Sequence, residues 1–154
     1  MKAAALIIIL NLGVLITAQS KTSDEFPATS EKCFQREHVP QSYKTNFHNF
    51  QYPNEEIVQK YIHCISSELE IWDNTNGFNL EKISQQYRSR ANEEVVLPVI
   101  SKCNRDNQNS NKPLWCYRAF LCILNTQVGN GLKRTYAANA KKVIYQMAII
   151  KVNQ

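Results

Sequence analysis

Glycine is scarce in this sequence, with four residues among 154, and proline is hardly more frequent, with five. Few glycines leave few sites for the tight turns of a hairpin-rich protein. The chain also has no glycine-rich phosphate loop, no nucleophile elbow, no His-Glu-x-x-His motif and no Cys-x-x-Cys pair. Beyond the first 20 residues, no apolar run is long enough to cross a bilayer. These absences leave little support for an enzyme or an integral membrane protein.

Acidic side chains are missing from the C-terminal part of the chain, where Asp106 is the last one. The formal net charge of +5 is therefore concentrated beyond that residue. A solvated basic face is the simpler interpretation, and attraction of an anionic ligand or surface is the alternative. Aromatic residues interleave with these cations, but the export signal described next argues against nucleic acid as the partner. The cations are Lys112, Arg118, Lys133, Arg134, Lys141, Lys142 and Lys151.

The N-terminus has the pattern of a secretory signal peptide over residues 1–20. Met1-Lys2 precedes an apolar run at 3–16, and small polar residues follow, with cleavage expected after Ala18 or Ser20. A membrane anchor is the alternative, but the run is shorter than the roughly 20 residues that span a bilayer. The sequence therefore predicts a secreted, soluble protein whose remaining length suits one domain.

Five cysteines lie beyond the predicted signal peptide. Because export leads to an oxidising compartment, we interpret them as disulfide partners before metal ligands. The count is odd, so one thiol is free or pairs with another molecule. The cysteines are Cys33, Cys64, Cys103, Cys116 and Cys122.

Apolar residues recur at helical spacing, which predicts an all-α domain over residues 33–154 after a flexible lead-in at 21–32. We expect six or seven helices. One begins after Pro53 with Asn54 as its cap, and it fades near Ile71.

A turn at 74–77 separates that helix from the next one, which Asn79 caps. Another helical segment runs from Glu93 to Cys103, where Pro98 is a bend or a start point. The Asn-rich stretch at 104–111 is interpreted as a loop.

Pro113 opens a strongly apolar segment that extends to Leu124. Because it is apolar nearly all round, we expect a central helix with neighbours on several sides. Glycines in the run 129–131 are expected to break the chain. An amphipathic helix should follow at 132–150, and its apolar stripe is better explained by core packing than by a cofactor.

Catalytic and metal-binding residues are sparse. His38, His48 and His63 are scattered, so we expect no metal ion and no cofactor. A Cys–His nucleophilic pair needs no fixed spacing, because its members meet only in the fold. A solvent-reachable His63 beside Cys116 would therefore support a secreted enzyme, which is otherwise not expected.

The segments QKYIHCI at 59–65 and EIWDNTNGFNLEKI at 70–83 resemble the second-and-third-cysteine region of insect odorant-binding proteins, and are most like the salivary D-seven family of blood-feeding flies. The resemblance covers Cys33 to Ile123. It implies a compact six- to seven-helix bundle around an internal ligand cavity. Against the salivary branch, minus-cysteine odorant-binding proteins of non-biting insects also lose the second and fifth cysteines.

The family's six cysteines pair first with third, second with fifth and fourth with sixth. Lys60 stands where the second is expected, so that cysteine is missing. The fifth is ambiguous, because the family's spacing places it at Pro113 whereas this chain has Cys116. The resemblance thus implies two disulfides, Cys33–Cys64 and Cys103–Cys122, with Cys116 left free.

The resemblance implies a small apolar or amphiphilic ligand: an odorant or pheromone, or in saliva an eicosanoid or biogenic amine. A buried ammonium ion needs a carboxylate partner, and none follows Asp106. We therefore favour an anionic or neutral ligand, although Glu68, Glu70 and Asp73 keep an amine possible.

The expected ligand site combines aromatic lining with cationic or hydroxyl anchors. Ordinary core packing is the alternative for each aromatic residue. A basic protein that binds anionic surfaces or host haemostatic factors is the alternative function. The candidate site residues are Trp72, Tyr87, Trp115, Tyr117, Arg118, Phe120, Arg134 and Tyr136.

Overall fold

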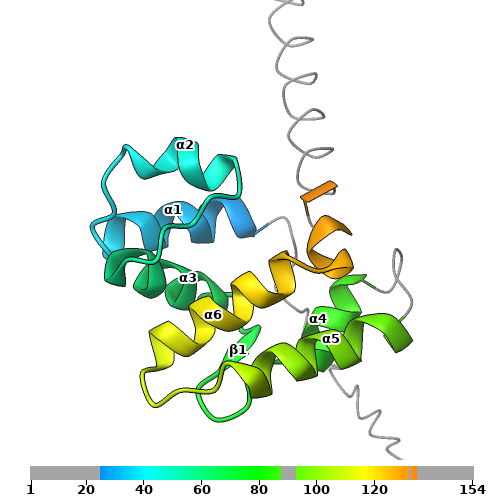
Figure 1. Ribbon diagram of the computed structural model, residues 1–154. Coiled ribbons are helices and arrows are strands. Elements are labelled where there is room, and N and C mark those ends of the chain that lie inside the picture. Colours follow the sequence, from blue (N-terminus) through cyan, green and yellow to red (C-terminus); the bar gives the residue numbers. More distant parts are fainter. Residues whose placement is uncertain (1–24, 88–92, 132, 135–154) are drawn as a thin grey trace, which may run out of the picture.

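A computed structural model describes residues 25–87, 93–131 and 133–134. Six helices and one short antiparallel hairpin are defined in these ranges, and a further helical segment occupies 127–131 and 133–134 (Figure 1). The predicted all-α class is confirmed, with the hairpin as an addition. The elements are α1 (Phe26–Arg36), α2 (Tyr43–His48), α3 (Glu56–Glu68), β1 (Trp72–Asp73), β2 (Gly77–Phe78), α4 (Leu80–Tyr87), α5 (Glu93–Asp106) and α6 (Lys112–Leu124).

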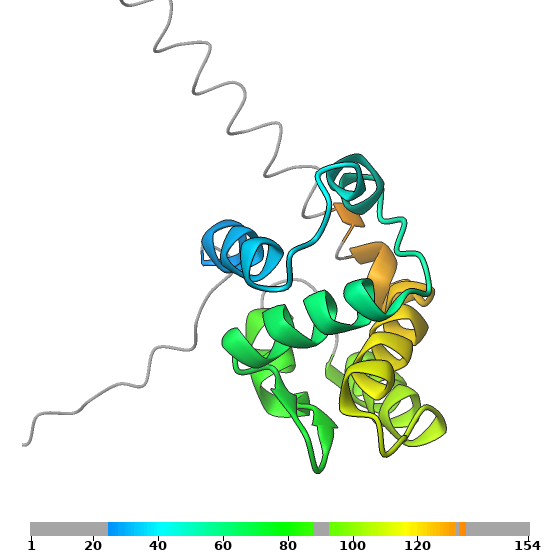
Figure 2. The ribbon, with the colours of Figure 1, turned by 90° about the vertical axis from the view of Figure 1, so that its left-hand side faces the viewer.

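Helix α6 is the centre of the bundle, as its apolar composition predicts. It packs against α3, α5 and β2, and it contributes buried side chains along most of its length, from Trp115 to Leu124. Figure 2 shows α1 on one side of α3 and α6 on the other. The core is therefore built where α3 meets α6, and the hairpin closes one end of it.

Two predicted helix starts are confirmed by their caps. The Asn79 Oδ1 atom accepts a bond from the Lys82 backbone N–H at 3.0 Å, and the Asn111 Oδ1 atom accepts one from Leu114 N–H at 3.1 Å. Asparagine suits this position because its side chain replaces a missing helical acceptor. Pro113 lies in the first turn of α6, where no N–H is needed.

The start and end of α3 differ from the prediction. Its first residue is Glu56, and Glu55 occupies the cap position, but its side chain makes no capping hydrogen bond to the helix. Asn54 instead accepts a bond from Gln59 Nε2 at 3.0 Å. The helix ends at Glu68 because the left-handed backbone of Glu70, with φ of 58°, turns the chain before Ile71.

Residues 26–32 are helical, although the sequence suggests a flexible lead-in at 21–32. Pro27 lies in the first turn of α1, where its fixed φ favours the helix, and Cys33 and Phe34 bury one face. The start of the predicted lead-in, together with the predicted signal peptide at 1–20, lies outside the described residues.

Two further predictions, which were based on asparagine and glycine residues, differ from the structure. The expected loop at 104–111 is shorter, because α5 passes through Pro98 and continues to Asp106. The expected break at 129–131 is helical instead, and the chain breaks at 125–126. A side chain at Gly129 would approach the Leu124 carbonyl oxygen to 2.2 Å, so glycine permits close packing there. The expected helix at 132–150 lies outside the described residues, apart from 133–134.

Two disulfides connect the helices. Cys33–Cys64 joins α1 to α3, and Cys103–Cys122 joins α5 to α6. These are the pairs that the family resemblance implies. Every helix in the described ranges is too short or too polar to span a bilayer.

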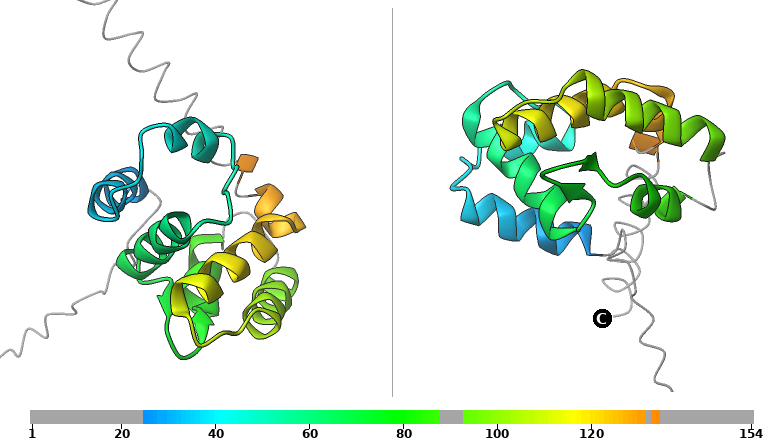
Figure 3. Two further views of the ribbon diagram at one scale, coloured as in Figure 1. Left: turned by 60° about the vertical axis from the view of Figure 1, so that its left-hand side comes forward. Right: turned by 90° about the horizontal axis from the view of Figure 1, so that it is seen from below.

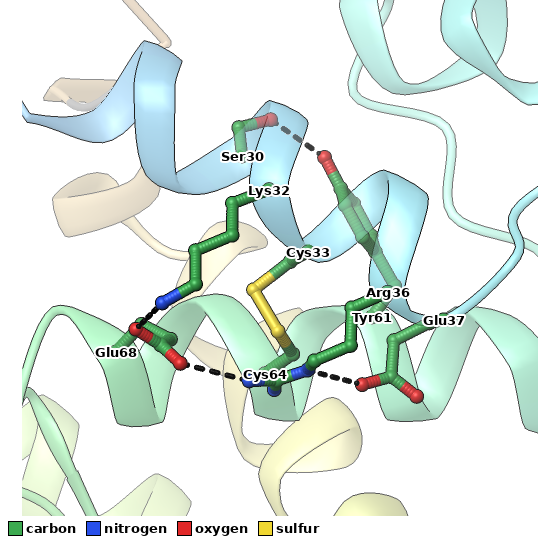
Figure 4. Close-up of a disulfide and its surroundings, with 8 residues drawn as sticks. All are labelled: Ser30, Lys32, Cys33, Arg36, Glu37, Tyr61, Cys64 and Glu68. Carbon is green, nitrogen blue, oxygen red and sulfur yellow. Dashed lines mark hydrogen bonds and ion pairs between the residues drawn. A yellow bond between two sulfur atoms is a disulfide. The ribbon is translucent and has the colours of Figure 1, made fainter.

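Ion pairs surround the first disulfide, as Figure 4 shows. Glu68 receives Lys32 Nζ and Arg36 Nη1, each at 2.8 Å, and Arg36 Nε also reaches Glu37 at 3.0 Å. These cations lower the pKa of Glu68. The disulfide and the exposed ion pairs together fix α1 along α3.

Candidate functional site

Trp72 and Trp115 form a buried pair between the hairpin and α6. Their rings meet edge to face with centroids 5.0 Å apart, and Phe78 packs edge-on against Trp72 at 5.1 Å. Both indole N–H groups are satisfied, one by Asn74 Oδ1 at 2.8 Å and the other by the Asn104 backbone oxygen at 2.9 Å. Because both are buried and fully bonded, these tryptophans pack as core.

Tyr117 and Phe120 lie elsewhere, on the part of α6 that faces Tyr52. The Tyr117 hydroxyl donates to the Tyr52 backbone oxygen at 2.8 Å, and burial raises the pKa of Tyr117. The half-buried Phe120 ring packs edge-on against Tyr52 with centroids 5.1 Å apart. The predicted aromatic residues therefore divide between two places rather than forming one site.

Phe120 belongs to a larger group of six rings that we call the aromatic cluster. Phe47 is stacked between two tyrosines, with centroids 4.8 Å from Tyr61 and 5.2 Å from Tyr52. Phe34 meets Phe47 and Tyr61 edge-on. The cluster joins α1, α2, α3 and α6, and comprises Phe34, Tyr43, Phe47, Tyr52, Tyr61 and Phe120.

The aromatic cluster is only partly closed to solvent. Phe34 and Tyr61 are buried, whereas the other four rings are half-buried. Hydroxyl groups line its edge, since Tyr61 Oη and Ser30 Oγ lie 2.8 Å apart and the Tyr43 hydroxyl donates to Glu55. Contiguous, partly exposed rings with a few polar groups are the composition expected of a site for an apolar molecule.

Phe120 is the one member of the cluster that was predicted as a site residue. The five that were not predicted are Phe34, Tyr43, Phe47, Tyr52 and Tyr61. A signal was present, because Tyr43 and Phe47 are four residues apart and so share one face of a helix. The stacking of Phe47 on Tyr61, 14 positions away in another helix, has no counterpart in the sequence pattern.

Of the remaining predicted residues, the two arginines are described, and both are exposed outside these aromatic groups. Arg118 is exposed on α6, and Arg134 is exposed with its Nε donating to the Asn130 backbone oxygen. The side chain of Tyr87 and all of Tyr136 lie outside the described residues. Of the C-terminal cations, the Lys112 ammonium lies 4.9 Å above the Trp115 ring. Lys141, Lys142 and Lys151 also lie outside the described residues.

The carboxylates considered for an amine ligand are engaged by the protein. Glu68 receives Lys32 and Arg36, and Glu70 receives Lys82 at 2.9 Å. Asp73 Oδ1 accepts the backbone N–H groups of the hairpin turn, at 2.8 Å and 2.7 Å, which lowers the pKa of Asp73.

A pocket of about 470 Å³ lies between the hairpin and the ends of α4 and α5. None of the candidate site residues lines it, although Asp73, considered for an amine ligand, does. Its polar groups largely satisfy one another: the Asn104 side chain bonds both backbone groups of Phe78, and Arg105 Nη1 donates to Ser101 Oγ. Its walls combine carboxylates and amides with the apolar residues Phe78 and Leu80.

Cys116 and His63 do not form a nucleophilic pair, because each has another partner. Cys116 is fully buried, and burial raises its pKa to about 12 although Ser66 bonds its thiol. His63 Nε2 instead lies 3.0 Å from Asn74 Oδ1. A thiol held protonated at neutral pH is a poor nucleophile. Among the described residues, no three His, Cys, Asp or Glu side chains gather as a metal ion would require.

Similarity to known proteins covers most of the described chain. The family model described as the PBP/GOBP family matches residues 17–126. The chain is similar to odorant-binding protein 22 of Aedes aegypti, with 23% identity over 102 residues, 66% of this chain and 74% of the relative. It is also similar to general odorant-binding protein 99a of Drosophila melanogaster, with 28% identity over 107 residues, 68% of this chain and 75% of the relative.

Proposed function

Because the chain belongs to the PBP/GOBP family of insect odorant-binding proteins, we propose that it is an exported carrier or scavenger of one small apolar or amphiphilic molecule. The family is one of binding proteins, so reversible binding without chemistry is the expected activity. Export rests on the signal-peptide pattern of residues 1–20. The names of the relatives favour odorant carriage over the salivary D-seven role.

The observation that carries this proposal is the aromatic cluster. Four of its rings, Tyr43, Phe47, Tyr52 and Phe120, remain half-buried although they stack on one another. Covering these rings with an apolar ligand would remove further apolar surface from water, which is the main source of affinity for such ligands. The hydroxyl groups at the cluster edge can bond a polar head group.

Charge favours a neutral or anionic ligand over an amine. The carboxylates beside the cluster are engaged: Glu31 receives Lys44 at 3.0 Å, and Glu55 receives the Tyr43 hydroxyl. Freeing Glu31 to bind an ammonium ion would break its ion pair with Lys44. An ammonium ion at Glu31 therefore gains less than a neutral hydroxyl group at the edge of the cluster.

Isothermal titration with ligands that share one tail separates these classes. Decanol, decanoic acid and decylamine differ only in the head group, and we expect the alcohol and the acid to bind more tightly than the amine. Octanol should bind roughly 15-fold more weakly than decanol, because two buried methylenes contribute about 1.6 kcal/mol. No heat from any of these ligands would contradict the proposal, and tightest binding of the amine would overturn the ligand class.

Matched phenylalanine variants test the location of the site. Phe120→Leu removes a ring of the aromatic cluster, and we expect decanol to bind about fivefold more weakly, since one aromatic contact contributes about 1 kcal/mol. Phe78→Leu removes a ring that packs on Trp72 outside the cluster, and it should leave the affinity unchanged. Equal losses in both variants would show that the ligand does not lie on the cluster.

A further inference from the structure

The pocket between the hairpin, α4 and α5, which we call the hairpin pocket, is separate from the aromatic cluster. None of the six cluster residues lines it. Figure 1 and the left view of Figure 3 show the hairpin at the end of the molecule opposite α2, which contributes two rings to the cluster. The volume of the hairpin pocket, about 470 Å³, is in the range of sites for small molecules.

Hydrogen bonds within the walls fix the shape of the hairpin pocket. The Asn104 side chain joins the end of α5 to the backbone of Phe78, and the Asn79 side chain caps the start of α4. Asp73 Oδ1 accepts two backbone N–H groups of the hairpin turn. The walls are therefore in place before a ligand binds, so binding does not have to order them.

Charged side chains of both signs line the hairpin pocket. Arg105 Nη1 donates to Ser101 Oγ at 2.8 Å, and the other N–H groups of the Arg105 guanidinium have no acceptor in the described part of the chain. Asp73 makes all its hydrogen bonds through Oδ1, so its Oδ2 atom has no partner among the described residues. Those bonds lower the pKa of Asp73, which is therefore ionised at neutral pH. Glu81 adds a second carboxylate to the walls.

These charges disfavour a ligand that has a single charge. A simple anion beside Arg105 is repelled by Asp73 and Glu81, and a simple cation is repelled by Arg105. A molecule with both charges avoids both penalties, and its apolar part can lie against Phe78 and Leu80, which also line the pocket.

We propose that the hairpin pocket binds a small zwitterion with an apolar body, such as leucine. Arg105 donates charge-assisted hydrogen bonds to the carboxylate of the ligand, and Asp73 Oδ2 accepts one from its ammonium group. This site does not depend on the proposed function, because it shares no residue with the aromatic cluster.

Three ligands with the same branched apolar group test this proposal on the full chain. Leucine has both charges, 3-methylbutylamine lacks the carboxylate, and 4-methylpentanoic acid lacks the ammonium group. In nitrogen–proton correlation spectra, leucine should shift the amide signals of Gly77, Phe78 and Leu80. We expect leucine to bind at least about tenfold more tightly than either analogue, since each analogue loses a charge-assisted hydrogen bond.

Single substitutions assign the two ends of the ligand. Arg105→Met should weaken the binding of leucine and of the acid about tenfold without weakening that of the amine. Asp73→Asn keeps the Oδ1 acceptor of the hairpin turn, and it should weaken leucine and the amine but not the acid. Lys102→Met removes an exposed cation of α5 that does not line the pocket, so all three affinities should stay within about twofold.

Pocket amide signals that do not shift in millimolar leucine would overturn the proposal, and so would shifts confined to the aromatic cluster or equal affinities for the three ligands. Equal losses of leucine affinity in Arg105→Met and Lys102→Met would also overturn it, because they would show an effect of overall charge. The ligand series uses the unaltered chain, so its result holds even if a variant fails to fold. If leucine binds here and decanol does not bind at all, the proposed function fails and this site stands.

Discussion

Replacing Asn104 with alanine removes the clamp between the hairpin and α5. The Asn104 side chain is 7% exposed, accepts the Phe78 N–H and donates to the Phe78 carbonyl, each at 2.9 Å. The position of Asn104 also explains why residue 77 is glycine: its φ is 85°, and a Cβ atom there would lie 2.6 Å from Asn104 Cγ. Alanine would leave two backbone groups of a buried residue without partners.

The loss of unfolding free energy in this variant follows from those two backbone groups. Each buried polar group left without a partner costs about 1–3 kcal/mol, so the pair gives about 2–6 kcal/mol. We expect the lower half of this range, because Asn104 and Phe78 border the open pocket and water can approach them. With a urea dependence of about 1–3 kcal/mol per molar, the unfolding midpoint should fall by at least about 0.7 M.

Urea unfolding followed by circular dichroism measures this loss. Asn107→Ala is the matched control, since it removes a single bond from a half-buried asparagine to the Cys103 carbonyl, at 2.9 Å. We expect the control to lose less than about 1 kcal/mol. Equal losses in the two variants, or a loss in Asn104→Ala below about 0.5 kcal/mol, would refute the reasoning about buried, unsatisfied groups.

The cysteines give three further predictions. Thiol titration should find one reactive thiol per chain after denaturation and none in the folded chain, since Cys116 is free and buried; a folded chain that reacts would contradict its burial. The pKa of the Cys116 thiol is about 12 in the folded chain, so between about pH 9 and pH 12 the thiol ionises only in the unfolded chain. Ionisation of the unfolded state should lower the unfolding free energy by about 1.4 kcal/mol for each pH unit in this range. Cys116→Ala should lack this component of the pH profile, and an identical profile would exclude it. Replacing Cys103 and Cys122 together with alanine should cost about 3 kcal/mol in urea unfolding, because their disulfide closes a loop over 19 residues; an unchanged midpoint would show that the disulfide adds no stability.

The sequence correctly predicted those features of the fold that depend on residues close together in the chain. Asn79 and the start of α6 were placed correctly, because a cap is satisfied by backbone groups three residues away. The central position of α6 followed from its uninterrupted apolar residues. The pairing of Cys33 with Cys64 was not local information, and only the family resemblance implied it.

Contacts between distant residues account for the errors. Asn104 was assigned to a loop by composition, yet its side chain is satisfied by Phe78, 26 positions away, and stays buried at the end of α5. Gly129 was interpreted as a breaker, although it serves close packing against Leu124. At the site, Phe120 was predicted. Phe47 was not, because it stacks on two tyrosines that lie outside its own helix.

The central claim is that the aromatic cluster holds the ligand, and intermolecular nuclear Overhauser effects test it most directly. With decanol bound to the isotope-labelled full chain, the methylene protons should show contacts to the rings of Phe47, Tyr52 and Phe120 and none to Trp72 or Trp115. Contacts to the two tryptophans, or to residues of the hairpin pocket, without any to the cluster would contradict the account.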